Sequence, residues 1–381
     1  ITDLLAKFTK AKSSFAEYAL TNNWVDQLKT RAQMRDQLIA MVGKNKKGNS
    51  YNHIGFKSYL KATSQDDRLN NQSMQSSTNQ VAVVVAKGTI LDGIQKPGTI
   101  GGDSTAKLLR KARNNKKVKA VVLRVDSPGG SAFASEIIRQ EVELLKAAGK
   151  PVIASMGTYA ASGGYWISAP ADKIYASPST ITGSIGIFGM MMTFEDSLSK
   201  LGIYTDGVGT TDISSFGPTQ PLTEGMAQLF QLSINKGYQD FITLVAENRN
   251  MTLAQVDAIA QGRVWSGKKA LELGLVDELG TLADAISAAA QLAKLTNYNT
   301  LLIEKDVSDR EKMLQKFFGE AKSLLLTDTS LFTKTELSLP VSVSDKPMNL
   351  LFQQLQAEIT KMNQFNDPQG IYTLCLACSV Q

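Results

Sequence analysis

A serine among small residues is the feature of this sequence best suited to catalysis. Ser162 lies within Ala160-Ala-Ser-Gly-Gly164, and a glycine turn, Asp126-Ser-Pro-Gly-Gly-Ser131, precedes it by about 30 residues. Because glycine has no Cβ, the backbone N–H groups of Gly130 and Gly163 can turn toward a bound carbonyl. A hydroxyl beside such donors is suited to acyl transfer. Taken singly, each motif is more often an ordinary turn or a tightly packed helix start.

Two apolar runs position these motifs at one edge of a predicted sheet. Ala120–Val125 precedes the glycine turn and Pro151–Ser155 precedes the serine. Both runs are short and rich in β-branched residues, which predicts two neighbouring parallel strands. The carboxyl ends of such strands meet at one rim, where α/β proteins place their pockets. Ser162 would then stand at or near the start of a helix, whose N-terminus favours developing negative charge.

Strand-like and helix-like segments alternate through the middle of the chain, which predicts an α/β fold with a parallel sheet. The predicted strands are Val81–Ala86, Lys119–Val125, Val152–Met156, Lys173–Ala176 and Ile185–Met192. The predicted helices are Asp103–Arg113, Ser135–Ala148, Thr223–Asn248, Thr252–Gln261 and Thr281–Lys294.

Four motifs, in order, resemble the signal peptide peptidase A family, also called protease IV, in its long tandem-repeat form. They are Asp126-Ser-Pro-Gly-Gly-Ser131, Ala160-Ala-Ser-Gly-Gly-Tyr-Trp-Ile-Ser168, Ser179-Thr-Ile-Thr-Gly-Ser-Ile-Gly-Ile-Phe-Gly189 and Gln261-Gly-Arg-Val-Trp-Ser266. The resemblance runs through nearly the whole chain and implies a Clp protease/crotonase fold. It also implies that Ser162 is the nucleophile and that the N–H groups of Gly130 and Gly163 are the oxyanion donors.

A serine nucleophile needs a base, and the chain offers no obvious one. His53, the sole histidine, lies in a polar segment far in sequence from both glycine turns, which argues against a Ser-His-Asp triad. In the family the base is a lysine about 50 residues beyond the serine position, supplied in the tandem form by the first repeat. The matching stretch here, Asp206–Gly217, holds Ser214 and Ser215 but no lysine. The resemblance therefore implies a Ser/Lys dyad whose lysine lies outside this chain.

Composition is that of a globular enzyme domain. The chain has 381 residues, 43% of them hydrophobic, and a net charge of +6. Its basic residues form no concentrated block beyond Lys44-Asn-Lys-Lys47, so nucleic-acid binding is not expected. No apolar stretch approaches the roughly 20 residues that span a bilayer. No motif predicts a metal site or a cofactor.

An internal repeat suggests that the chain begins inside a longer protein. Tyr18–Leu28 can be laid on Lys269–Leu279 at an offset of 251 residues, with Ala, Leu, Val, Asp and Leu coinciding. We therefore expect residues 1–43 to be the tail of an upstream repeat and residues 44–80, which are polar, to be a linker. Residues 81–300 would be the peptidase repeat and residues 301–381 a C-terminal extension.

The resemblance further implies substrates, a location and an assembly. The substrates would be cleaved signal peptides and similar hydrophobic peptides, at the membrane surface on the periplasmic face of a bacterial inner membrane. The anchor would lie in the missing N-terminal part. The assembly would be a homo-oligomer, with a tetramer suggested.

Two other functions remain open from the residues themselves. One is a crotonase-like acyl-CoA enzyme, which would use the same paired oxyanion donors. The other is a catalytically incomplete repeat that only binds peptides or builds an oligomer, which the absent lysine favours. Cys375 and Cys378 form a lone Cys-x-x-Cys pair, either a local disulfide or two free thiols, and two thiols cannot complete a tetrahedral zinc site.

Overall fold

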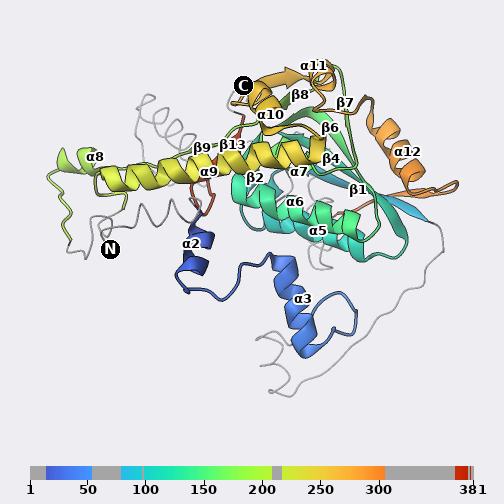
Figure 1. Ribbon diagram of the computed structural model, residues 1–381, viewed down its shortest axis with the longest axis horizontal. Helices are drawn as coiled ribbons and strands as arrows, with labels where there is room; N and C mark the ends of the chain where they lie inside the picture. The colour runs from blue at the N-terminus through green and yellow to red at the C-terminus, as the bar shows by residue number, and fades with distance from the viewer. Residues whose placement is uncertain are drawn as a thin grey trace, which may run out of the picture.

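The computed structural model describes residues 14–53, 79–96, 98–207, 217–304, 365–375 and 378. Its described strands form two sheets, and the larger has the order β10-β8-β6-β4-β1-β12, with β7 beside β6 and β11 beside β7. The pairs within it are parallel except for β10, which is antiparallel to β8. The predicted α/β fold with a parallel sheet is therefore confirmed (Figure 1).

The strands of this larger sheet are β1 (Gln80–Lys87), β4 (Val118–Ser127), β6 (Val152–Ala161), β7 (Lys173–Ala176), β8 (Ile181–Gly183), β10 (Val264–Ser266), β11 (Glu278–Leu279) and β12 (Asn299–Leu302). The smaller sheet has the order β3-β2-β5-β13-β9. Its strands are β2 (Ile90–Leu91), β3 (Ile100–Gly101), β5 (Gly129–Ser131), β9 (Phe188–Gly189) and β13 (Ile371–Leu374).

The described helices are α2 (Phe15–Thr21), α3 (Arg31–Val42), α5 (Gly102–Asn114), α6 (Ala132–Ala147), α7 (Gly163–Ser168), α8 (Glu195–Ser199), α9 (Glu224–Arg249), α10 (Leu253–Ile259), α11 (Gly267–Glu272) and α12 (Leu282–Leu292). Those expected from the sequence at α5, α6, α9, α10 and α12 are confirmed to within a few residues.

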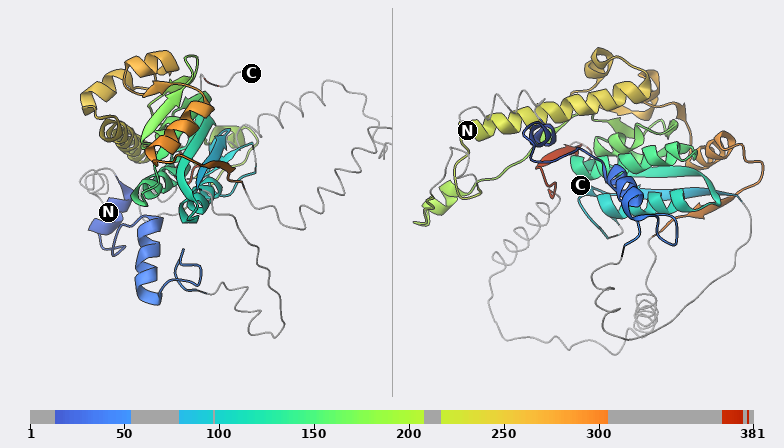
Figure 2. Two further views of the ribbon diagram at one scale, coloured as in Figure 1. Left: turned by 90° about the vertical axis from the view of Figure 1, so that its right-hand side faces the viewer. Right: turned by 60° about the horizontal axis from the view of Figure 1, so that its bottom comes forward.

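Helices cover both faces of the large sheet, which explains why its strands read as almost continuous apolar runs. Ala82 and Val84 of β1 belong to a core shared with α5, α6, α7 and α9. Val81 and Val83 point to the opposite face and pack with the alanines of α12. Figure 2 shows the sheet between these two layers.

One predicted strand, Ile185–Met192, is wrong. The structure has β8 ending at Gly183 and only the two-residue β9 at Phe188–Gly189. Gly183 and Ser184 both have positive φ, +77° and +50°, so the chain leaves the extended conformation just where the apolar run begins. The turn separates two short strands that belong to different sheets.

The proposed boundary at residue 300 falls inside an element of the main sheet. Strand β12 spans it and pairs with β1, from Gln80 opposite Asn299 to Val83 opposite Leu302. Further along, β13 joins the smaller sheet between β5 and β9. The chain after residue 298 therefore contributes strands to both sheets, β12 to the larger and β13 to the smaller.

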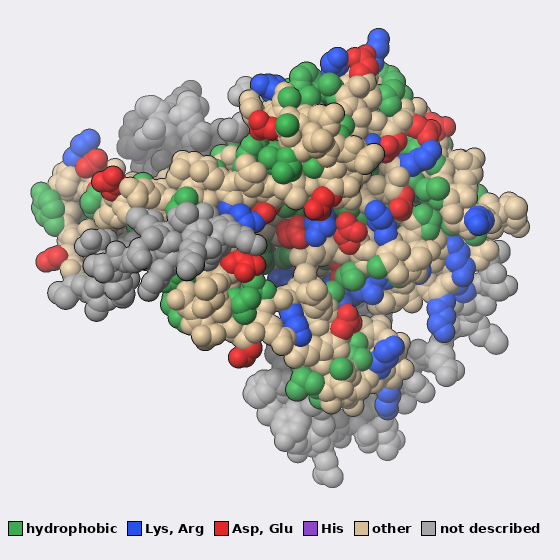
Figure 3. All heavy atoms as spheres, viewed as in Figure 1, with side chains coloured by type: hydrophobic (Ala, Val, Ile, Leu, Met, Phe, Trp, Pro, Cys, Tyr) green, Lys and Arg blue, Asp and Glu red, His purple; other side chains and the backbone are tan. Residues whose placement is uncertain are grey.

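An arm extends from this core. The N-terminal half of α9 runs out from the sheet, with α8 at its far end (Figure 1). Leu201 and Tyr204, next to α8, are 74% and 80% exposed. In Figure 3 this arm lies at the left margin. Within the described part of the chain, no helix combines the length and apolar character needed to cross a membrane.

Helices α2 and α3 lie outside the two large hydrophobic clusters, and their bounds match those of α11 and α12 to within a residue or two at the same offset of 251. Thr30 and Thr281 both form capping boxes at a helix start. Asn23 and Gly274, in the turns before them, both have positive φ. The sequence repeat is thus matched by a repeat of local structure.

Candidate active site

Ser162 stands at the end of β6 in a strained conformation. Its φ of +54° and ψ of −114° lie in a region that non-glycine residues rarely adopt, at a cost of about 1–3 kcal/mol. Two backbone bonds hold it there: its N–H donates to the Gly183 carbonyl at 2.8 Å, and its carbonyl accepts from the Trp166 N–H at 2.8 Å. The second bond begins α7, so the prediction that the serine precedes a helix is confirmed.

The glycine turn packs directly against this serine. A Cβ built on Gly129 would lie 3.1 Å from the Ser162 Cβ and 2.7 Å from the Gly163 nitrogen. The turn is fixed by Ser127, whose hydroxyl donates to the Gly88 carbonyl at 2.7 Å and accepts from the Gly129 N–H at 3.1 Å. Tertiary structure therefore brings together the two motifs that the sequence placed about 30 residues apart.

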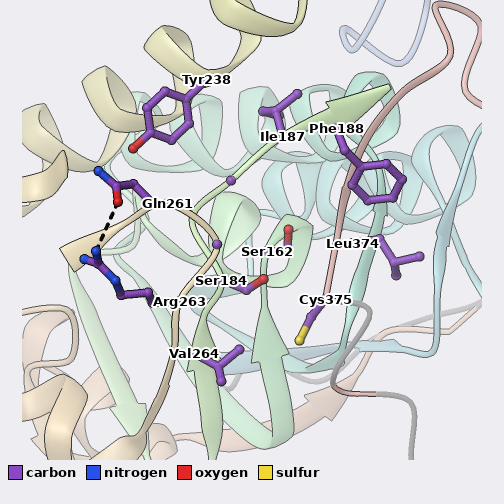
Figure 4. A pocket seen from close by; sticks show the side chains of 12 residues that line it. Ser162, Ser184, Ile187, Phe188, Tyr238, Gln261, Arg263, Val264, Leu374 and Cys375 are labelled. Atoms are coloured by element: carbon purple, nitrogen blue, oxygen red, sulfur yellow. Dashed lines mark hydrogen bonds between the residues drawn. The ribbon is translucent and has the colours of Figure 1, made fainter. Parts of the chain in front are cut away.

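A cavity of about 630 Å³ opens beside Ser162. The residues that line it come from the β8–β9 connection, from α9, from the loop before β10 and from the end of β13: Ser162, Ser184, Gly186, Ile187, Phe188, Tyr238, Gln261, Gly262, Arg263, Val264, Leu374 and Cys375. Figure 4 shows Ser162 and Ser184 close to one another at its centre. Three of the four sequence motifs thus contribute to the lining, and the glycine turn does not.

Two polar side chains define one wall of the cavity. Burial raises the pKa of the Tyr238 hydroxyl to about 12, and its hydrogen bond to Asp257 adds to the rise, so the phenol stays protonated near neutral pH. Arg263 donates to the Gln261 side chain at 3.0 Å (Figure 4). Neither group can act as a base near neutral pH, since one is a protonated phenol and the other a guanidinium.

No base for Ser162 is found among the described residues that line the cavity, because none of them is lysine or histidine. His53 is exposed and lies against Tyr51. Lys173 is paired with Glu278 and Lys236 with Asp240. Residues 208–216, which include Ser214 and Ser215 of the stretch matching the family's base position, lie outside the described residues.

Sequence reasoning missed the residue that contacts the serine hydroxyl. Thr373 of β13 places its Oγ1 2.8 Å from Ser162 Oγ, and both residues are buried, at 0% and 1% exposure. Cys375 and Cys378, left open as a disulfide or two thiols, are joined by a disulfide that packs on Ala161. Nothing in the local sequence of residues 365–375 indicates the contact between Thr373 and Ser162.

Comparison with known proteins identifies the family. The model of "Peptidase family S49" matches residues 144–296, which include Ser162 and Gly163. "Putative signal peptide peptidase SppA" of Enterococcus faecium is 33% identical over 245 residues, which cover 63% of this chain and 70% of that protein. The chain belongs to peptidase family S49.

Longer relatives of this S49 chain match it more fully. "Protease 4" of Salmonella typhi is 42% identical over 371 residues, 97% of this chain and 57% of that protein. The chain thus spans a little under three fifths of the length of this relative and of "Protease 4" of Haemophilus influenzae. A ClpP1 variant from Listeria monocytogenes, a solved structure, covers 54% of this chain and 94% of its own, with 17% identity and a TM-score of 0.36.

Proposed function

We propose that this chain is the nucleophile-bearing part of a serine endopeptidase, with Ser162 as the nucleophile. The observation that carries the proposal is the strained Ser162 at the end of β6, held against the glycine turn and facing a cavity. A strained turn between strand and helix places the serine at the carboxyl end of β6, beside the cavity that a substrate could enter. Membership of a peptidase family supports the same reaction.

The N–H groups of Gly130 and Gly163 would stabilise the oxyanion of the tetrahedral intermediate. In support, the two glycine segments are in contact, with a Cβ built on Gly163 3.1 Å from the Gly129 Cα. Neither glycine position leaves room for a side chain, so the backbone itself must face whatever binds there.

The base would be a lysine from an upstream repeat, which completes a Ser/Lys dyad. Two observations favour this arrangement over a base within the chain: the described cavity lining holds no lysine, and α2–α3 repeats the geometry of α11–α12. Residues 1–43 would then be the tail of that repeat, 44–80 a linker, 81–300 the peptidase repeat and 301–381 an extension whose strands join it.

Exposed apolar side chains in the turn between α2 and α3 support the upstream repeat. Trp24 and Val25 are 70% and 41% exposed, whereas Leu275 and Val276, their counterparts at the offset of 251, are buried at 0% and 2%. The second copy buries these positions against its own sheet. The first copy would bury them against the sheet of the upstream unit.

The substrates, location and assembly are also part of the proposal. Cleaved signal peptides and similar hydrophobic peptides would be cut at the periplasmic face of a bacterial inner membrane, by a homo-oligomer. The name of the Enterococcus relative supports the substrate class. The exposed apolar arm at Leu201 and Tyr204 supports contact between subunits.

A comparison of residues 1–381 with the longer protein tests the split dyad. Peptide hydrolysis should be very slow for residues 1–381 and should appear when the upstream repeat is present. In the longer protein, Ser162→Ala should lower kcat by roughly 10⁴-fold or more, because no other nucleophile replaces the hydroxyl. Equal activity of the fragment and the longer protein would contradict the split dyad, and an active Ser162→Ala protein would contradict the nucleophile.

A catalytically incomplete, peptide-binding repeat is the second candidate, since the described cavity lining holds no base. The same experiment separates the two candidates. Binding of a peptide without hydrolysis, even with the upstream repeat present, would favour the second.

A further inference from the structure

Strand β13 lies in the position that an extended peptide would take beside Ser162. It is antiparallel to β5 on one side and to β9 on the other, with Thr373 opposite Gly130 and Tyr372 opposite Phe188. Without β13, these two strands would present facing edges, and an edge pairs readily with an added strand. The slot is therefore one strand wide, and β13 fills it.

The strand crosses both the serine and the proposed oxyanion donors. Thr373 Oγ1 lies 2.8 Å from Ser162 Oγ. The Thr373 carbonyl oxygen lies 3.1 Å from the position of a Cβ on Gly163 and 2.1 Å from that of a Cβ on Gly129. The next ladder bond runs from the Cys375 N–H to the Pro128 carbonyl at 2.7 Å. A peptide bond of this chain thus sits where a substrate carbonyl would have to sit.

A buried carboxylate anchors the strand. Asp367 is 8% exposed, and its Oδ2 accepts from the Ser131 hydroxyl at 2.5 Å and from the Phe133 N–H at 3.0 Å. Its Oδ1 accepts from the Gln369 and Ile371 N–H groups at 2.8 and 3.2 Å. Asp367 therefore joins the start of β13 to Ser131, the residue that both ends the glycine turn and caps α6.

The strand can leave the slot without opening the main core. Among the described residues, neither of the two large hydrophobic clusters contains one beyond Ile303. Cys375 and Cys378 pack on the small group around Ala161, and the ring of Tyr372, which is 3% exposed, contacts that of Phe188. Undocking would cost the ladder bonds, the Asp367 contacts and the burial of Tyr372 and of the disulfide, which is a local free energy.

We propose that residues 365–375 form a tethered inhibitory strand, which occupies the substrate slot and must leave it before a peptide can bind. The proposal rests on the proposed peptidase function of Ser162. A tethered segment competes at a high effective concentration, so it raises the apparent KM for a peptide and leaves kcat unchanged. An extended peptide that enters would pair with β5 and β9 as β13 does.

The test is Asp367→Asn in the longer, active protein. The amide keeps the size of the side chain but loses the charge that four donors share, and hydrogen bonds to charged groups are the stronger ones. We expect KM for an extended peptide substrate to fall by about tenfold, the effect of weakening the docked state by one order of magnitude, with kcat unchanged. Asp284→Asn is the matched control, because Asp284 also accepts from donors at a helix start, Thr281 N and Oγ1 at 2.7 Å each, but in α12. It should leave KM unchanged.

A second variant and a second measurement guard against a folding defect in Asp367→Asn. Removal of residues 365–381 should lower KM in the same way, and a synthetic peptide of residues 365–375 should then inhibit the truncated protein competitively. Hydrogen exchange at residues 371–374, measured on residues 1–381, should be slow in the wild type and fast in Asp367→Asn. This readout does not depend on activity.

The outcomes separate the two proposals. Unchanged KM in both variants would overturn the inhibitory strand and leave the peptidase function standing. Equally slow exchange in wild type and Asp367→Asn would overturn the role of Asp367 as the anchor. Loss of residues 374–381 from the purified protein, seen by mass spectrometry and absent in Ser162→Ala, would make the strand a substrate instead of an inhibitor. Inactivity of the longer wild-type protein and of both variants would overturn the function, and with it the inhibition.

Discussion

At the scale of single residues, the site depends on backbone positions that exclude side chains. Gly130 has a φ of +153°, and a Cβ there would lie 1.9 Å from the Ile90 carbonyl oxygen. Ser162 meets a different constraint, because it keeps its side chain and accepts a positive φ instead. Strain and close approach therefore both occur at the two segments proposed to touch the reacting carbonyl.

We predict that Gly130→Ala will destabilise the protein as well as inactivate it. The collision with the Ile90 carbonyl and the positive φ together should lower the free energy of unfolding by about 2 kcal/mol or more. Gly149→Ala is the control, because Gly149 also has a positive φ, +72°, but has open space around it. That change should cost only about 1 kcal/mol. Urea unfolding of both variants checks the difference, and equal costs would contradict it.

Since any side chain at Gly130 displaces β2, loss of activity in a Gly130 variant does not by itself demonstrate a lost hydrogen bond. Turnover of the Gly130→Ala protein must therefore be corrected for its folded fraction before it is compared with turnover of the wild type.

At the scale of elements, one ion pair ties the end of α9 to the large sheet. Arg249 donates to both oxygens of Asp277, at 2.9 and 2.6 Å, and its side chain is only 8% exposed. Asp277 also accepts from the Ile174 N–H of β7 at 2.7 Å. Helix α9 carries Tyr238 of the cavity wall, so this contact positions part of the candidate site.

We predict that Asp277→Ala will cost about 3 kcal/mol of stability, because it leaves the buried Arg249 charge without its partner. Glu272→Ala removes one member of a pair with Lys269 in which both side chains are about half exposed, at 52% and 50%. Water screens that pair, so its loss should change stability little. Thermal unfolding of the two variants provides the comparison, and similar midpoints would show that Arg249 finds another partner.

At the scale of the whole molecule, the proposed upstream repeat predicts different effects of substitution in the two helix pairs, α2–α3 and α11–α12. Trp24→Ala should have little effect on the stability of residues 1–381, because its ring is 70% exposed there. In the longer protein the same change should cost roughly 3 kcal/mol or more, since the ring would then be buried.

Leu275→Ala is the counterpart in the second copy. Leu275 is fully buried already, so its truncation should cost roughly 2–5 kcal/mol in the fragment and in the longer protein alike. The measurement is the denaturant midpoint of each variant in the fragment and in the longer protein, compared with the wild type of the same length. If Trp24→Ala lowers stability equally in the fragment and in the longer protein, no upstream unit covers the turn between α2 and α3.

The sequence by itself determined the elements and motifs that rest on local pattern. Apolar runs predicted β1, β4, β6 and β7, because strands buried on both faces leave a continuous signal. Helical periodicity predicted α5, α6 and α9, and small residues marked the serine and the turn. The run from Ile185 failed, because hydrophobicity alone does not reveal the positive φ of Ser184 that ends β8.

Only the tertiary structure decided which of these parts meet. The contact of Thr373 with Ser162 spans 211 residues, and the anchoring of Asp367 by Ser131 spans 236. Such pairings depend on how the sheets are assembled, and the short strand Ile371–Leu374 has no periodicity that names its partners. The same holds for the cavity, where Ser184, Tyr238 and Arg263 converge from three separate segments. Local propensity fixes an element, whereas its neighbours follow from packing and ladder bonds across the whole fold.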